Sequence, residues 1–200
     1  MSRVASRAPV QVRLTGRRSL ADLVWVANTS HGAAAHWFAR PGPDEPPHDH
    51  LLDAVDAMRY LTDHHVTVPD GVPTSSQLER LAAIRGVLRD LAEGRDGWQQ
   101  RVARLLEPSS FRLEPDAGIV ARTAGWDGFV DDLLVPLLEL IRSGARVSVC
   151  ANPACRLVFV DDSRNGSRRW CDNAGCGNRV RVRRYPATNR RILPSCLVKT

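Results

Sequence analysis

The stretch Cys150-Ala151-Asn152-Pro153-Ala154-Cys155 is followed, fifteen residues later, by Cys171-Asp172-Asn173-Ala174-Gly175-Cys176. Each pair of cysteines encloses four residues, and a tight turn between the two can aim both sulfurs at one metal ion. Pro153 and Gly175 are residue types that suit such turns. Four thiolates complete a tetrahedral shell and leave no coordination position for a water molecule. The spacing therefore predicts one structural Zn²⁺ bound by Cys150, Cys155, Cys171 and Cys176.

The same cysteines could instead form two disulfides, stay as unrelated buried thiols, or hold an iron–sulfur cluster. Disulfides need an oxidising compartment, yet no apolar run of a signal peptide follows the basic N-terminus, and the chain's five cysteines are an odd number. Four cysteines in symmetric pairs within 27 residues argue against chance. Four thiolates also suit an iron–sulfur cluster, but the turn pattern favours zinc. We expect Cys196, which lies outside the pairs, to be a spare thiol.

The residues between the pairs predict a hairpin. Leu157–Val160 is a short apolar run that is typical of a strand, and Asn165-Gly166 is a turn signal. We expect Ser167–Trp170 to be the returning strand that delivers Cys171 to the metal.

The segment after Cys176 fits two structures. Val180 and Val182 alternate with arginines, as in a strand, whereas in a helix Arg179 and Arg183 would share a face. We favour the helix, because a zinc-binding turn followed by a helix is a common way to complete such a module.

The run from Phe159 to Cys171 and the tetrad Cys176-Gly177-Asn178-Arg179 resemble the CGNR zinc finger. The resemblance covers roughly residues 146–186 and assigns the four cysteines above as the ligands. Fingers of this kind typically end bacterial proteins that carry an alanine-rich ABATE domain and are described as stress-induced transcription regulators. The resemblance thus implies a helical ABATE-like domain over residues 15–145, a small treble-clef-like finger with four cysteine ligands over residues 146–186 and a basic tail over residues 187–200. Members often follow the tetrad with Ala and Lys, and Val180 and Arg181 stand there in this chain.

The positive charge is concentrated in the finger and tail. The chain has a net charge of +6, and residues 156–191 hold ten arginines against three aspartates, so the rest of the chain is almost neutral. A basic module on a neutral body is the pattern expected of a protein that binds nucleic acid. The arginines that we expect to contact DNA are Arg168, Arg169, Arg179, Arg181, Arg183 and Arg184.

A less specific explanation of these arginines stays open. With 27 arginines and one lysine, arginine is the general cation of this chain. Some of Arg164, Arg168 and Arg169 could simply pair with Asp161 or Asp162 and cover the finger's own loops.

The first 145 residues predict a mainly α fold. Ser19 and the Ser76-Gln77-Leu78-Glu79 box are helix starts, and Pro115-Asp116-Ala117 joins the two strands of one hairpin. Asp131 and Asp132 are neighbours on one helix, and we expect them on a solvated face. The apolar periodicity places helices over residues 18–29, 49–65, 76–93, 98–106 and 127–143.

Four histidines raise the question of a second metal. His48 and His50 flank Asp49 at a helix start, and His64 and His65 end the same predicted helix. Residues sixteen positions apart on one helix lie about 24 Å apart, so the two groups cannot share an ion. We therefore expect no second metal site from these residues.

No catalytic motif accompanies the finger. The chain lacks a nucleophile elbow, a phosphate-binding loop and a dinucleotide fingerprint, so we do not expect an enzyme. Our first hypothesis is a cytoplasmic transcription regulator in which the finger binds DNA and the helical domain senses a small effector or forms a homodimer. A protein-interaction module or an RNA-binding protein is the alternative, and Trp170 and Tyr185 could stack on bases. No run is long and apolar enough for a membrane span.

Overall fold

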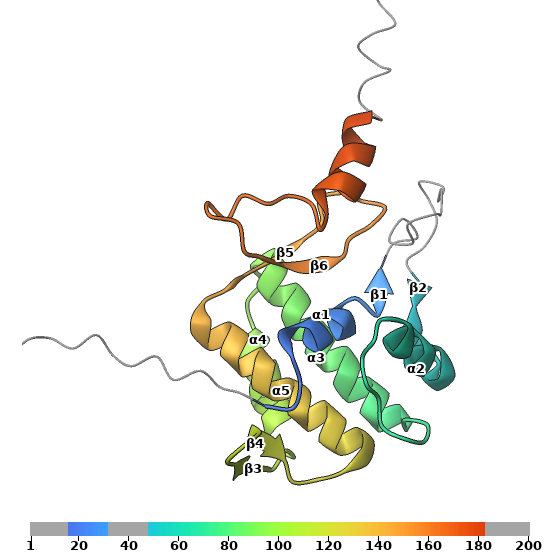
Figure 1. Cartoon of the computed structure of the whole chain (residues 1–200), viewed down its shortest axis with the longest axis vertical. Helices are drawn as coiled ribbons and strands as arrows, with labels where there is room; N and C mark the ends of the chain where they lie inside the picture. The colour runs from blue at the N-terminus through green and yellow to red at the C-terminus, as the bar shows by residue number, and fades with distance from the viewer. Residues whose placement is uncertain (1–15, 32–47, 183–200) are drawn as a thin grey trace, which may run out of the picture.

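The computed structural model describes residues 16–31 and 48–182, and it is mainly helical with three small two-stranded sheets (Figure 1). The helices are α1 (Leu20–Ala27), α2 (Ala54–Asp63), α3 (Ser75–Glu93), α4 (Trp98–Leu106) and α5 (Gly125–Ser143). The strand pairs are β1 (Ser30–His31) with β2 (His48–Asp49), β3 (Phe111–Glu114) with β4 (Gly118–Ala121), and β5 (Arg146–Val149) with β6 (Val158–Asp161). The predicted class, a helical region followed by a four-cysteine finger, is confirmed.

Side-chain caps fix where the helices begin. Ser19 caps α1 as predicted, and it forms a reciprocal capping box with Asp22. The box of α3 is formed by Thr74 and Gln77, so the predicted cap at Ser76 is wrong by two residues. The predicted helix over residues 49–65 is broken: Asp49 caps a short 3₁₀ turn, His50–Leu52, and Asp53 caps α2.

The core lies where α1, α3 and α5 pack together. The side chains that are fully buried there include Leu23, Leu81, Ile84, Leu133 and Leu137. The β5–β6 pair at the start of the finger packs on the same core, since Val158 is buried in it and Val147 and Val160 pack against it. The finger is therefore continuous with the helical body, above which it lies in Figure 1.

Asp131 and Asp132 are not on a solvated face, so that prediction is wrong. Both carboxylates are buried, and Asp131 accepts a hydrogen bond from Arg80 at 2.6 Å. Asp132 accepts one from the backbone N–H of Ala121 at 2.6 Å, which ties β4 to α5. A buried carboxylate needs such partners, and these two hold the hairpin and α3 against α5.

The finger's hairpin differs from the prediction. β6 pairs antiparallel with β5, from Arg146 opposite Asp161 to Val149 opposite Val158, and no strand forms over residues 167–170. The reason lies in Asp161, whose carboxylate accepts hydrogen bonds from the backbone N–H groups of Ser163 and Arg168. These bonds close the intervening loop, and the N–H of Arg168 is used by a side chain rather than by a strand.

Within residues 16–31 and 48–182, none of the helices combines the length and the apolar character that crossing a membrane requires.

Candidate metal centre

The four predicted ligands come together in space. The sulfur atoms of Cys150, Cys155, Cys171 and Cys176 all lie within 4.8 Å of one another. The Cys155–Cys171 and Cys171–Cys176 sulfur separations are both 3.7 Å. A tetrahedron with Zn–S bonds of about 2.3 Å has edges of about 3.8 Å, so the arrangement fits one zinc ion.

The geometry also decides between the alternatives. All four cysteines are free thiols, which removes the two-disulfide arrangement. An iron–sulfur cluster interposes several iron and sulfide atoms between its thiolates, and four sulfurs that all lie within 4.8 Å of one another leave no room for them. The cluster of thiols is therefore consistent with a single structural zinc.

The first pair of ligands is held by a turn around Asn152. The N–H of Cys150 donates to the carbonyl of Leu157 at 2.8 Å, so β5 and β6 converge on the metal. The Asn152 carbonyl accepts the N–H of Cys155 at 2.9 Å, and its side-chain amide lies 3.6 Å from the sulfur of Cys176. Asn152 thus links the two halves of the site. Sequence reasoning missed this residue, although an asparagine inside a tight turn is a common local signal.

The second pair begins at Asp172 and ends in a helix. The Asp172 carboxylate accepts from the N–H groups of Ala174 and Gly175, which starts a π-helical turn, Asn173–Gly177. Residues 178–182 continue as α-helix, so the helix that we favoured after Cys176 is confirmed over these residues. At Gly177, an added Cβ would lie 3.0 Å from the Trp170 ring, and glycine therefore lets the indole pack on this turn.

The metal centre is enclosed. Cys150, Cys155 and Cys176 are buried, and Leu157, Phe159 and Trp170 pack around them. Hydrogen bonds among the four thiols lower the pKa of Cys150 and raise those of Cys155 and Cys171, so one thiolate is stabilised by neighbours that keep their protons until a cation displaces them. Four protein ligands leave a zinc ion no open position, so the site stabilises structure.

A buried four-cysteine centre that joins two turns and a helix defines this part of the chain as a zinc finger. Residues 146–189 match the family model of the CGNR zinc finger. The finger was predicted over residues 146–186, so the match begins at the predicted residue and ends at residue 189, slightly beyond the predicted end. No significant match to a curated protein was found. The ABATE-like domain over residues 15–145 stays a prediction.

Arg168 binds the finger itself. Its guanidinium donates to the carbonyls of Trp170, at 3.0 Å, and Cys171, and it lies 3.3 Å from Asp162. The same group lies over the ring of Phe159. This arginine holds the second pair of ligands in place, as the less specific explanation anticipated.

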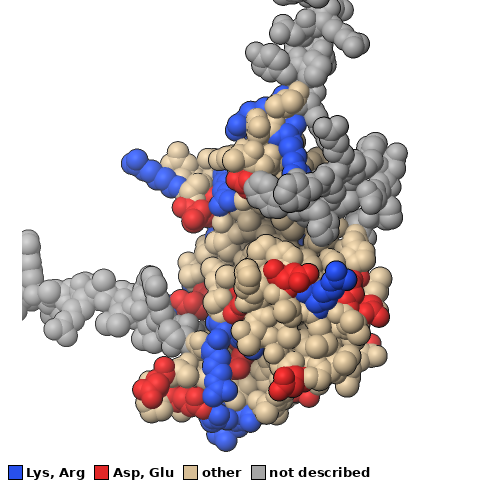
Figure 2. All heavy atoms as spheres, turned by 45° about the vertical axis from the view of Figure 1, so that its right-hand side comes forward, with Lys and Arg blue, Asp and Glu red and all other residues tan. Residues whose placement is uncertain are grey.

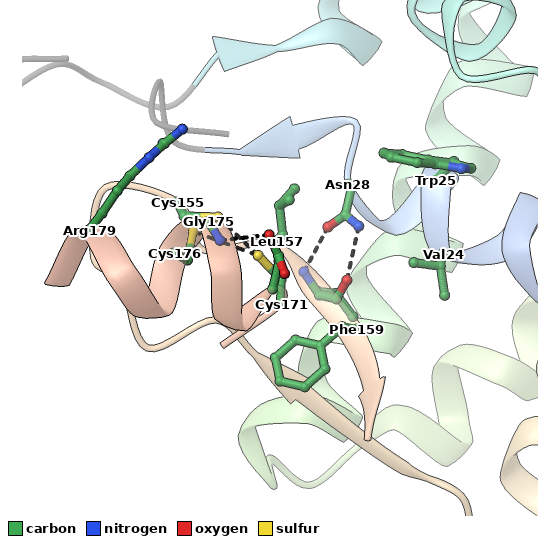
Figure 3. Close-up of a pocket in the computed structure, with 12 residues that line it drawn as sticks. Val24, Trp25, Asn28, Cys155, Leu157, Phe159, Cys171, Gly175, Cys176 and Arg179 are labelled. Carbon is green, nitrogen blue, oxygen red and sulfur yellow. Dashed lines mark hydrogen bonds between the residues drawn. The ribbon is translucent and has the colours of Figure 1, made fainter. Parts of the chain in front are cut away.

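The other predicted DNA-contacting arginines differ in exposure. Arg169 is exposed and lies over the Trp170 ring, with 5.5 Å from its guanidinium carbon to the ring centroid. Arg181 is exposed, whereas Arg179 is half-buried and extends from its helix away from the cysteines (Figure 3). Figure 2 shows Lys and Arg side chains at the surface of the upper part of the molecule, where the finger lies. Arg183, Arg184, Tyr185 and Cys196 lie outside the described residues.

A pocket of about 250 Å³ lies between α1 and the finger (Figure 3). Val24 and Trp25 line it from α1, and Leu157, Phe159 and Arg179 line it from the finger. Trp25 therefore borders this cavity. Trp126, by contrast, is buried, and its indole N–H donates to the Gly71 carbonyl.

Asn28 fastens the finger to α1. Its side-chain oxygen accepts the N–H of Val158 at 2.7 Å, and its amide donates to the Val158 carbonyl at 2.9 Å (Figure 3). Arg156 and Glu93 add an ion pair at 3.4 Å between the finger and the end of α3. Only Gly144 and Ala145 separate α5 from β5, so the finger and the helical body form one rigid unit.

Proposed function

We propose that this protein is a transcription regulator that binds DNA through its zinc finger. The observation that supports the proposal best is the exposed positive charge of a finger held rigidly by metal and body. Residues 146–182 carry seven arginines against three aspartates, and one of these aspartates, Asp161, is buried. A fixed cationic surface suits a polyanion, because its charges need no reordering when the phosphates bind.

The contact surface that we propose consists of the finger's helix and the loop beside it. Arg181 on the helix and Arg164 and Arg169 on the loop are exposed. The predicted set also includes Arg179 on this helix, and Arg183 and Arg184, which lie outside the described residues. Arg168 acts by holding the finger, because its guanidinium is bound to Trp170, Cys171 and Asp162.

The helical region would act as the sensor in this proposal. The pocket between α1 and the finger is bordered by apolar groups of both, and also by Asp172, Arg179 and three of the zinc-ligating cysteines, so it suits a small, mainly apolar effector. An effector there would contact both the body and the helix that carries the proposed DNA contacts. A homodimer formed by an ABATE-like domain is the alternative role of this region.

Binding rather than catalysis is the activity that we propose for the finger. Its metal has four protein ligands, and such a shell offers no position for substrate. A zinc site built from four cysteines needs those cysteines reduced, so we propose that the protein acts in the cytoplasm.

The test is the salt dependence of binding to double-stranded DNA. The logarithm of affinity should fall with the logarithm of salt concentration, with a slope of about −0.9 per phosphate neutralised. The double variant Arg169→Ala/Arg181→Ala should retain zinc and bind DNA more weakly. Its slope should be shallower by the amount expected for about two lost phosphate contacts. The matched control is Arg59→Ala/Arg104→Ala, which removes two exposed arginines of the helical body.

Two results would reject the proposal. One is a DNA affinity that barely changes with salt. The other is an equal loss of affinity in both double variants, because the finger would then not be the binding surface. Recovery of one stoichiometric protein partner without nucleic acid would favour the interaction-module alternative.

A further inference from the structure

A second group of metal-ligating side chains lies in the helical body, away from the finger. His48, His50 and Asp56 offer ligand atoms that all lie within 4.8 Å of one another. Nε2 of His48 lies 2.8 Å from Oδ2 of Asp56, and Nδ1 of His50 lies 2.9 Å from the same oxygen. We propose that these three residues form a second site, which binds a divalent transition-metal ion such as Zn²⁺.

The donor set fits that class of ion. Two imidazole nitrogens and one carboxylate oxygen are the ligands of open three-residue sites for zinc and non-haem iron. In a tetrahedral shell with bonds of about 2.1 Å, ligand atoms lie about 3.4 Å apart, so the side chains need to separate by roughly half an ångström. The ion would replace the protons that the two imidazoles now share with Asp56.

The residues around His50 fix its ring for metal binding. While Nδ1 faces Asp56, Nε2 lies 3.3 Å from Nε2 of His31, and both histidines are buried. A ligating histidine generally donates its other ring N–H to a neighbouring acceptor, which sets the tautomer and the ring orientation. His31 is placed to accept that proton, and Tyr60 stacks on the His50 ring with centroids 4.2 Å apart.

The backbone around the site is fixed as well. β1 and β2 pair His31 with His48, and the N–H of His50 donates to the Thr29 carbonyl at 2.8 Å. Between the two ligating histidines, Asp49 is bound by both terminal nitrogens of Arg85, at 2.6 and 2.9 Å. The site is therefore organised before any ion arrives, which lowers the cost of binding.

Charge and access also favour an ion. The Asp56 carboxylate faces both imidazoles through the same oxygen, Oδ2, so its negative charge lies where the ion would bind. The side chains of His48 and Asp56 are 59% and 35% exposed, which leaves a route from solvent. Sequence analysis dismissed a metal here because it paired His48 and His50 with distant histidines and did not consider Asp56.

The experiment counts metal equivalents on the full-length chain. Protein purified under reducing conditions with one equivalent of zinc in the finger is titrated with Zn²⁺ against a competing chelator. The wild type should bind a second equivalent, and His48→Ala and Asp56→Asn should retain the first equivalent and lose the second. His65→Asn is the matched control, because it removes an exposed histidine whose left-handed backbone asparagine tolerates, and it should keep both equivalents.

A spectroscopic measurement separates the two sites. Co²⁺ bound by histidine and carboxylate lacks the thiolate charge-transfer absorption of Co²⁺ in the finger. The proposal is overturned if the wild type binds one equivalent only, if His48→Ala still binds two, or if the second Co²⁺ adds thiolate absorption. Since no finger residue takes part, each result is independent of DNA binding.

Discussion

At the scale of single residues, the buried carboxylate of Asp131 is the centre of a hydrogen-bond network that joins three other side chains. Its carboxylate accepts hydrogen bonds from Arg80, at 2.6 Å, and from the hydroxyls of Ser109, at 2.8 Å, and Thr123, at 3.3 Å. It is 2% exposed, so its charge is compensated by these partners rather than by water.

Asp131→Ala should lower the free energy of unfolding by about 3–5 kcal/mol, because it leaves Arg80 half-buried without its carboxylate. Asp127 lies 3.7 Å from Arg80 and can take over part of this role, which favours the lower end of that range. Urea denaturation followed by the helical signal measures the change. Asp127→Ala, at a more exposed carboxylate, should cost about 0–1 kcal/mol. A loss below about 1 kcal/mol for Asp131→Ala would contradict the importance of this ion pair.

The same scale shows which residues the sequence reveals. The zinc ligands are predictable because the chelating spacing is local: each pair of cysteines is joined by one turn. The burial of Asp131 is not, because its main partner lies 51 residues away on α3. The proximity of Asp56 to His48 and His50 is not predictable for a different reason. The apolar pattern predicts one helix over residues 49–65, but the break at Asp53 brings the first turn of α2 back toward the two histidines.

At the scale of elements, apolar periodicity located the helices, and the finger's hairpin was assigned to the wrong partner. α4 was predicted with its observed bounds, since residues 98–106 show a clear helical pattern. β6 was predicted to pair with residues 167–170, but it pairs with β5 on the other side of Cys150. The alternating Val147 and Val149 were a signal for β5. Asp161 closes the loop after β6 through the N–H groups of Ser163 and Arg168, and the second of these lies seven residues away, beyond a simple turn signal.

Removal of zinc should divide the finger into two parts. Zinc binding by such sites amounts to about 10–16 kcal/mol, so a strong chelator under reducing conditions should unfold the segments that the metal holds, residues 150–157 and 162–182. β5 and β6 should stay folded, because Val158 is buried in the core of the helical body. Hydrogen exchange measured before and after chelation should therefore show lost protection in the ligand turns and retained protection in the strand pair.

Cys171→Ala should give the same exchange pattern as chelation, with zinc lost and α4 unchanged. Full protection of the ligand turns without metal would show that packing alone stabilises them. Loss of protection in β5 and β6 would instead show that the whole finger folds as one metal-dependent unit.

At the scale of the whole molecule, one asparagine joins the finger, α1 and α2. Asn28 ends α1, its side chain binds both backbone groups of Val158, and its carbonyl accepts the Tyr60 hydroxyl at 2.9 Å. β5 occupies one edge of β6, and Asn28 satisfies backbone groups at the other edge. The orientation of the finger on the body thus depends on buried contacts that are specific to this side chain.

Asn28→Ala should loosen the finger without releasing its zinc. The change leaves the N–H and carbonyl of Val158 buried without these partners, at about 1–3 kcal/mol for each group. Hydrogen exchange should show faster exchange at β6 and at the end of α1, while elemental analysis still finds one zinc per finger. Asn178→Ala removes an exposed asparagine of the finger and should leave both measurements unchanged.

Unaltered protection of β6 in Asn28→Ala would mean that core packing alone orients the finger. If the finger binds DNA as a rigid surface, Asn28→Ala should also bind DNA more weakly than the wild type, even though its zinc content and its arginines are unchanged.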